Sequence, residues 1–93
     1  MIENAIENRV VEDAEKAGWL VRKLSWVGRR GGMDRFFAKE GRTVLIEFKK
    51  PGGKTSANQA KEVARFLGAG VEVHVLDNPL SAYRVLGIDY ARL

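Results

Sequence analysis

The tetrapeptide Ile46-Glu47-Phe48-Lys49 places an acid and a base two residues apart within a run of β-forming residues. Because side chains alternate along a strand, we expect Glu47 and Lys49 on one face and Ile46 and Phe48 on the other. The apolar pair can anchor in a core while the charged pair shares the second face. A same-face ion pair on a half-exposed strand is the plain alternative, and the tetrapeptide alone does not separate it from a functional site.

Asp34 offers a second carboxylate to the same face. Residues 34–39 and 43–50 read as two antiparallel strands joined by a short Gly-containing connection, as in a hairpin. An Asp that opens one strand and a Glu towards the end of its neighbour can come close enough to ligate one hard cation. Carboxylate and carbonyl oxygens suit Mg²⁺ or Mn²⁺. We therefore predict a metal site formed by Asp34, Glu47 and the backbone carbonyl of Phe48.

These groups match the needs of phosphodiester hydrolysis. That reaction requires a cation to neutralise developing negative charge, an activated water, and a group that orients the water or stabilises the phosphorane. Mg²⁺ or Mn²⁺ meets the first two needs because a bound cation acidifies its water. Lys49, facing the same side, could meet the third.

The remaining sequence predicts the elements that hold these residues. Apolar residues at spacings of three and four indicate an amphipathic helix over residues 2–17. The full prediction has the order αβββαβα, with strands over 19–26, 34–39, 43–50 and 71–76, a loop over 28–32, and later helices over 57–68 and 79–86. A strand, a helix and a strand in succession imply a parallel crossover. An α/β fold with a mixed sheet flanked by helices is expected.

Length and composition restrict the possible functions. At 93 residues, one domain over 1–93 is expected. The absence of Cys excludes a zinc knuckle and a thiol nucleophile, and it fits a reducing cell interior. No apolar run approaches the roughly 20 residues that span a bilayer. A soluble, cytoplasmic protein with no membrane partner is expected.

The positive charge lies in the middle of the chain. The net charge is +4 overall, but residues 22–54 contain ten Lys or Arg and only three acids. This stretch therefore carries +7 and the other residues carry −3. A central basic block favours a polyanionic partner such as DNA, although an ordinary solvated face has the same composition.

Four separated motifs resemble the PD-(D/E)XK nuclease pattern, in particular the stand-alone VRR-NUC domains common in phages and bacteria. They are Gly31-Gly32-Met33-Asp34-Arg35, Ile46-Glu47-Phe48-Lys49, Pro51-Gly52-Gly53-Lys54 and Gln59. The resemblance spans nearly the whole chain and implies a restriction-endonuclease-like core. Met33 stands where the family often has Pro, a departure that bears on the rigidity of the loop and not on the chemistry.

The resemblance also implies roles by position. In that family the acidic pair and the lysine form the catalytic centre, and a Glu of the first helix supports the metal, directly or through water. This Glu corresponds to Glu7, with Glu3 one turn earlier as the rival. A Gln of the second helix points into the site. The implied catalytic set is Glu7, Asp34, Glu47, Lys49 and Gln59.

Gln59 has a second interpretation. Ser56-Ala57-Asn58-Gln59 is a capping-box pattern, in which the Gln59 side chain would reach back to the Ser56 amide. The sequence leaves both roles open.

Five basic residues near the predicted site are candidates for DNA phosphate contacts, although each could be a plain solvated charge. They are Arg29, Arg30, Arg35, Lys50 and Lys54. His74, between valines on a predicted strand, favours packing over general-base chemistry, and Trp19 and Trp26 favour burial over base stacking.

The predicted function is a structure-selective DNA endonuclease. Stand-alone members of the resembled family form homodimers and are associated with branched DNA such as four-way (Holliday) junctions. The resemblance implies the same here, with Mg²⁺ or Mn²⁺ and no small-molecule cofactor, in a bacterial or phage-infected cell. The alternatives are a DNA-binding module that kept the fold without catalysis, and a purely structural assembly protein. Asp34 and Glu47 favour catalysis, because acids in a basic patch repel phosphate unless a cation intervenes.

Overall fold

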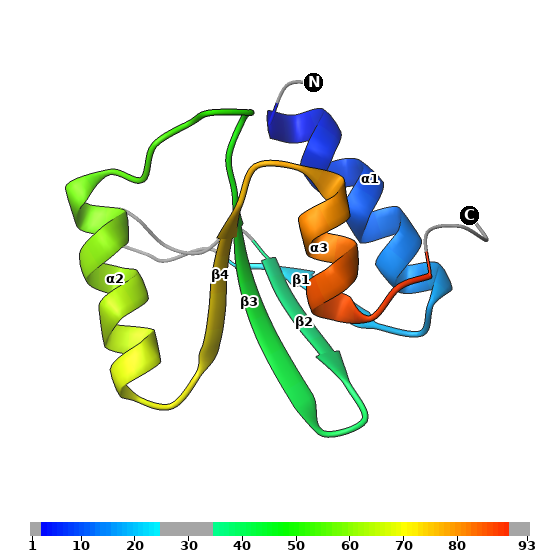
Figure 1. Cartoon of the computed structure of the whole chain (residues 1–93). Helices are drawn as coiled ribbons and strands as arrows, with labels where there is room; N and C mark the ends of the chain where they lie inside the picture. The colour runs from blue at the N-terminus through cyan, green and yellow to red at the C-terminus, as the bar shows by residue number, and fades with distance from the viewer. Residues whose placement is uncertain (1–2, 25–34, 90–93) are drawn as a thin grey trace.

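A four-stranded sheet with helices on both faces forms the protein (Figure 1). The computed structural model describes residues 3–24 and 35–89. Its elements are α1 (Glu3–Lys16), β1 (Leu20–Lys23), β2 (Arg35–Lys39), β3 (Arg42–Phe48), α2 (Ala57–Gly68), β4 (Glu72–Leu76) and α3 (Pro79–Leu86). This order confirms the predicted αβββαβα arrangement. None of the described helices has the length and apolar character needed to cross a membrane.

The strands follow one another across the sheet in the order β1-β2-β3-β4. β1 pairs with β2 and β2 with β3 in antiparallel fashion, whereas β3 and β4 pair in parallel. The chain passes from β3 to β4 through α2, which is the predicted crossover. The sheet is therefore mixed, and β3 has one neighbour of each direction.

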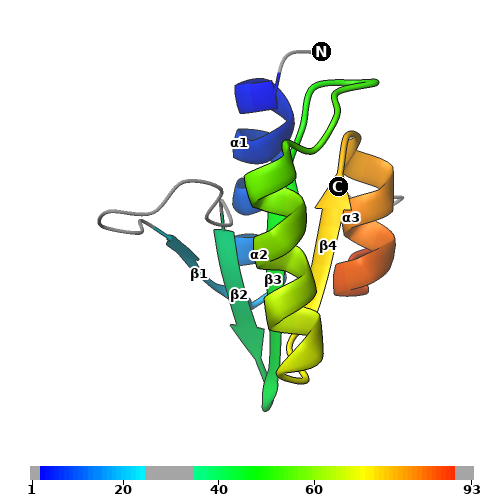
Figure 2. The same ribbon diagram turned by 90° about the vertical axis from the view of Figure 1, so that its left-hand side faces the viewer.

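Side-chain alternation on β3 divides the core into two parts. Val44, Ile46 and Phe48 are fully buried on the face where α1 and α3 pack. Leu45 lies on the opposite face, in a smaller core with Val63 of α2. Figure 2 shows α2 in front of the sheet, on the face opposite α1. Both faces of β3 are thus covered.

Helix α1 is held by its apolar stripe and by a lysine at its end. The predicted stripe is buried: Ile6, Val10 and Ala14. The helix stops before Gly18, whose φ of +95° is a conformation that favours glycine. Lys39 of β2 donates to the Ala17 carbonyl at 2.7 Å, which satisfies a carbonyl at the end of the helix.

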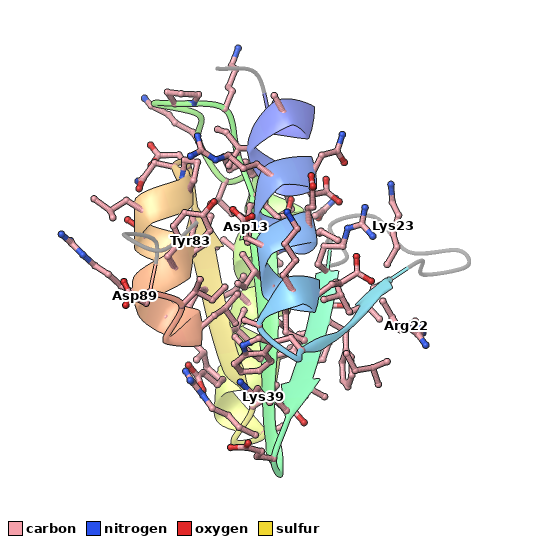
Figure 3. The ribbon with its side chains drawn as sticks, turned by 90° about the vertical axis from the view of Figure 1, so that its right-hand side faces the viewer. Asp13, Arg22, Lys23, Lys39, Tyr83 and Asp89 are labelled. Atoms are coloured by element: carbon pink, nitrogen blue, oxygen red, sulfur yellow. The ribbon has the colours of Figure 1, made fainter. Side chains whose placement is uncertain are left out.

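Helix α3 begins and ends at residues suited to those positions. Asn78 caps its start by accepting from the Ser81 N–H at 2.8 Å, and Gly87 ends it with a φ of +66°. Tyr83 donates its hydroxyl hydrogen to Asp13 of α1, and Figure 3 shows the two side chains between these helices. Burial and the bond to Asp13 raise the pKa of Tyr83. The bond joins α1 to α3 beside the main core.

The structure corrects the predicted strand ends by a few residues. The strand predicted over 43–50 is Arg42–Phe48. β3 ends where its partner ends: the Lys49 N–H bonds to the carbonyl of Leu76, the last residue of β4, at 2.8 Å. β1 and β4 are also shorter than predicted. Asp34, predicted to open β2, lies outside the described residues.

An ion-pair cluster links β3 and β4 on the face covered by α1 and α3. Arg42 donates to both carboxylate oxygens of Glu72, at 3.0 and 2.6 Å, and to the Val85 carbonyl at 2.8 Å. The Arg42 guanidinium lies 5.8 Å from the centre of the buried Trp19 ring. His74 Nε2 is 2.8 Å from a Glu72 oxygen. Trp19 and His74 thus have packing and pairing contacts, as the sequence favours.

Acid should disrupt this ion pair only at a pH below the one that protonates an ordinary glutamate. The hydrogen bonds from Arg42, with a smaller contribution from His74, lower the pKa of Glu72 from 4.5 to about 2. A carboxylate with a lowered pKa in the folded chain stabilises the fold fully above pH 4.5, and this contribution is lost as the pH falls towards 2. Glu72→Gln should therefore lose less unfolding free energy than wild type over this window, measured by urea unfolding at each pH.

Arg42→Gln should reduce the acid dependence in the same window, because it removes the cation that lowers the Glu72 pKa. An acid dependence identical to wild type in both variants would contradict the assigned ion pair.

Candidate active site

Glu47, Lys49 and Gln59 form a hydrogen-bonded cluster at the end of β3. The Gln59 Nε2 donates to Glu47 Oε1 at 2.7 Å, and the Gln59 Oε1 accepts from Lys49 Nζ at 2.6 Å. Lys49 Nζ lies 3.3 Å from Glu47 Oε1. Each of the three side chains therefore contacts the other two.

Glu47 in this cluster is buried and Lys49 is partly buried. Glu47 is 2% exposed, and the Lys49 side chain is 13% exposed. Burying a carboxylate costs free energy unless a cation and hydrogen-bond donors compensate for lost water. Lys49 and Gln59 provide this compensation. The burial argues against a simple ion pair on a half-exposed strand.

Strand β3 directs Glu47 towards α2 by the alternation that the sequence predicts. The adjacent residues Ile46 and Phe48 are buried on the α1 and α3 side, so Glu47 projects from the opposite face. Gln59 meets it there from the first turn of α2. The parallel register aligns Glu47 with Val75 of β4. The cluster therefore depends on a strand and a helix separated in sequence by the exit from β3.

Both geometries considered for Gln59 occur together. The Gln59 N–H donates to Ser56 Oγ and the Ser56 N–H donates to Gln59 Oε1, both at 3.1 Å, which completes the capping box. The same Gln59 Oε1 accepts from Lys49, and the amide nitrogen is left to donate to Glu47. The helix cap thus fixes the orientation of the amide within the cluster.

The chain leaves β3 through an exit loop, residues 50–54. The Gly53 N–H donates to the Lys50 carbonyl at 2.8 Å, and Gly52 has a φ of +74°. A Cβ on Gly53 would lie 2.9 Å from the Lys50 carbonyl oxygen and 3.3 Å from Lys49 Cβ. The exit loop therefore packs directly against the base of the Lys49 side chain.

Glu7 and Arg35 form a separate, largely buried ion pair on the other side of the sheet. The Arg35 Nε donates to the Glu7 carboxylate. Arg35 is aligned with Ile46, so it shares the face covered by α1 and not the face of Glu47. The structure joins these two predicted site residues to each other. The roles predicted for Glu7 at the metal and for Arg35 on DNA stay predictions.

Of the other predicted site residues, some lie on the exit loop and the rest lie outside the residues that the structure describes. Lys50 and Lys54 are exposed on the exit loop, where phosphate could reach them. Outside the described residues lie Arg29, Arg30 and Asp34, and the side chain of Glu3 is likewise not described. Within residues 3–24 and 35–89, no group of three or more His, Cys, Asp or Glu side chains is arranged to hold a metal ion.

Two carboxylates that the sequence did not single out contact the elements carrying the cluster. Glu62, one turn after Gln59 on α2, is buried and lies 3.2 Å from Arg65. Asp77, directly after β4, accepts from the Gly52 N–H at 3.1 Å. The three-residue spacing from Gln59 could have indicated Glu62. The Asp-Asn-Pro turn pattern indicates that Asp77 leaves the strand, but not which backbone group it meets.

The fold and the cluster define a class of protein: an α/β nuclease domain with a restriction-endonuclease-like mixed sheet. A solved structure of a VRR_NUC domain matches with a TM-score of 0.83 and 29% identity, over 95% of this chain and 97% of that chain. A protein named "Putative nuclease p44", from Acyrthosiphon pisum secondary endosymbiont phage 1, is 38% identical over 77 residues, which is 82% of this chain and 83% of that protein. No protein-family model matches the chain. The chain belongs to the VRR-NUC family of nucleases, which confirms the resemblance in its motifs.

The cap and the cluster can be separated by mutation. Ser56→Ala removes the capping hydroxyl but leaves the Ser56 N–H and the cluster, so it should lower the unfolding free energy by about 1 kcal/mol and leave the cleavage rate per folded molecule close to wild type. Gln59→Glu keeps an oxygen for the cap but replaces the donor to Glu47 with a second carboxylate. It should lower cleavage far more than Ser56→Ala does.

Urea unfolding and initial cleavage rates, measured on the same preparations, check this prediction. Equal losses of cleavage in the two variants would mean that Gln59 acts through the helix cap alone.

Proposed function

We propose that this protein is a metal-dependent, structure-selective DNA endonuclease that hydrolyses phosphodiester bonds in branched DNA. The observation that carries the proposal is the hydrogen-bonded cluster of buried Glu47 with the partly buried Lys49 and Gln59, in a chain of the VRR-NUC family. The basic stretch over residues 22–54 includes Glu47 and Lys49 and suits a polyanionic substrate.

The position of Glu47 supports catalysis over simple DNA binding. A surface that only holds phosphates gains nothing from a carboxylate, which repels them. This carboxylate is also buried, so it costs desolvation free energy that the fold must offset. An acid kept at such a cost is expected where a cation is to be bound next to the substrate.

The donor groups present fit Mg²⁺ or Mn²⁺. Mg²⁺ in phosphoryl-transfer sites is commonly held by one or two carboxylates together with waters and substrate phosphate, and a cage of many protein ligands is not needed. Glu47, Asp34 and the backbone carbonyl of Phe48 would hold the ion. Glu7, which pairs with Arg35 on the other face of the sheet, would support the ion through water. When bound, the ion would neutralise charge on the phosphate and acidify a water.

Asp34 is proposed as the second carboxylate because of its place in the chain. Asp34 directly precedes Arg35 in the chain. Arg35 pairs with Ile46 across the ladder between β2 and β3, and Glu47 directly follows Ile46. Consecutive Cα atoms are about 3.8 Å apart. A carboxylate one residue before Arg35 is therefore a suitable partner for a carboxylate one residue after Ile46.

The described side chains would act on the substrate in distinct ways. Lys49 carries a positive charge beside Glu47, where it can stabilise the charge that develops on the phosphorane or hold the attacking water. Gln59 would keep the Lys49 ammonium and the Glu47 carboxylate in one orientation, since it contacts both. Lys50 and Lys54 would bind the DNA backbone, joined by Arg29 and Arg30. Arg35 would reach DNA only on leaving its ion pair with Glu7.

A homodimer acting on four-way junctions is part of the proposal. Two-fold symmetry would present two sites to two strands of like polarity, which suits paired nicking of a junction. A contact set made mainly of backbone charges reads DNA shape and not sequence.

Lys49 should be required for cleavage. Purified protein should cut branched DNA only with Mg²⁺ or Mn²⁺, and Lys49→Ala should lower the rate by about 10²- to 10³-fold while DNA binding persists, because it removes a charge from the transition state. Lys16→Ala, which removes an exposed lysine of α1, is the matched control and should cleave like wild type.

Lys49→Ala also leaves Glu47 buried without its cation, so Lys49→Gln should be tested beside it, with circular dichroism to verify folding. Turnover at the wild-type rate in either folded variant would contradict the assignment. DNA binding without cleavage and without Mn²⁺ uptake, measured by calorimetry on wild type, would instead indicate a binding-only module.

A substrate panel should separate structure selectivity from general nuclease activity. Four-way, flap, splayed-arm and linear DNA should be compared under the same metal conditions, and we expect the four-way junction to be cut fastest. Light scattering should give a mass of about twice the 10.4 kDa of one chain. Equal cleavage rates on all four DNAs would contradict the proposed structure selectivity. Cleavage of the four-way junction by a protein that is monomeric in light scattering would contradict the proposed homodimer.

A further inference from the structure

Asp77 contacts the exit loop from the strand next to β3. Because β3 and β4 run in parallel, their carboxyl ends meet at one end of the sheet. The Lys49 N–H bonds to the Leu76 carbonyl at 2.8 Å, one residue before Asp77. Asp77 Oδ2 then accepts from the Gly52 N–H at 3.1 Å. The ladder between the two strands is thus continued by a side chain.

The exit loop needs such a contact because its own residues constrain it weakly. Pro51 has no N–H to donate, and Gly52 and Gly53 have no side chains to pack. Gly52 adopts a positive φ, at +74°. The loop nonetheless lies against Lys49, since a Cβ on Gly53 would meet Lys49 Cβ at 3.3 Å. A shift of the loop would therefore disturb the base of the Lys49 side chain.

Asp77 is itself held in place. The Asn78 Nδ2 donates to Asp77 Oδ1 at 2.9 Å, and the Asn78 Oδ1 caps α3 by accepting from the Ser81 N–H at 2.8 Å. A chain of hydrogen bonds therefore runs from the start of α3 through Asn78 and Asp77 to Gly52. The bonds from Asn78 and then from Gly52 lower the pKa of Asp77. Hydrogen bonds to an ionised acceptor are stronger than neutral ones.

We propose that Asp77 is a positioning residue for the Lys49 ammonium, which it fixes through the Gly52 N–H and the exit loop. This inference rests on the proposed function, in which Lys49 acts on the substrate. Lys49 is then held at two points. Its Nζ contacts Gln59 and Glu47. Its backbone N–H bonds to β4, and its base packs against the exit loop, whose Gly52 N–H donates to Asp77. The side-chain contacts of Asp77 within the described residues are with Gly52 and Asn78, so it would act on geometry and not on the substrate.

A positioning role and a charge effect predict different mutational patterns. Asp77→Ala removes the acceptor for Gly52, and displacements of about 1 Å at a reacting group can cost about 10²-fold in rate, so kcat should fall about 10- to 100-fold with little change in KM. Asp77→Asn keeps an oxygen that can accept from the Gly52 N–H and should retain most of the wild-type kcat. If Asp77 acted only by repelling DNA, both variants would behave alike and both would lower KM.

The experiment compares cleavage kinetics and amide exchange in the same proteins. Glu12→Ala is the matched control, because it also removes one exposed carboxylate, from α1. Exchange of the Gly52 N–H, measured by nuclear magnetic resonance, should accelerate in Asp77→Ala but not in Asp77→Asn or Glu12→Ala. This readout does not depend on activity.

The outcomes separate the two proposals. Absence of cleavage by wild type, with Gly52 protected by Asp77, would overturn the proposed function and leave Asp77 as a structural anchor without a positioning role. Cleavage by wild type that Asp77→Ala does not slow, or an equal loss in Asp77→Ala and Asp77→Asn, would overturn the positioning role while the nuclease assignment stands. Slow turnover in Asp77→Ala, rescue in Asp77→Asn and faster Gly52 exchange are the results expected.

Discussion

The burial of both faces of β3 is the constraint on which the rest of the structure depends. Strand alternation sends Val44, Ile46 and Phe48 into the core beneath α1 and α3, and Leu45 and Glu47 to the side of α2. A shift of one residue in register would exchange the two sets and place Glu47 in the apolar core. The apolar residues therefore fix the direction of the carboxylate, because the cost of burying an unpaired charge there excludes the alternative register.

The cluster of Glu47, Lys49 and Gln59 compensates for the burial of a carboxylate on β3. A carboxylate on the inner strand of a small sheet is buried, so it needs a cation and a donor, and Lys49 and Gln59 supply them. Removing either partner would leave an uncompensated group, which is costlier than replacing the whole cluster. Under the proposed function, the groups that stabilise Glu47 are also those that would face the phosphate.

Much of this arrangement was predictable because it follows from local patterns. The element order, the parallel crossover and the shared face of Glu47 and Lys49 rest on periodicities of two and three to four residues, which the structure confirms. The capping box at Ser56 was equally local. The two geometries predicted for Gln59 were not alternatives, because one amide oxygen accepts from both the Ser56 N–H and Lys49. The strand ends were less predictable, since they depend on where a neighbour stops bonding.

The sequence by itself determined the elements, their order, the side of β3 on which Glu47 and Lys49 lie, and the family through four motifs. Each of these depends on near neighbours in the chain. Only the tertiary structure decided which distant groups meet: Glu7 with Arg35 on the far face of the sheet, Gln59 with Glu47, and Asp77 with Gly52 at the exit from β3. Such contacts depend on helix packing and on the parallel register between β3 and β4. Their residues are 12 to 28 positions apart, a range over which no short sequence pattern specifies the path of the chain.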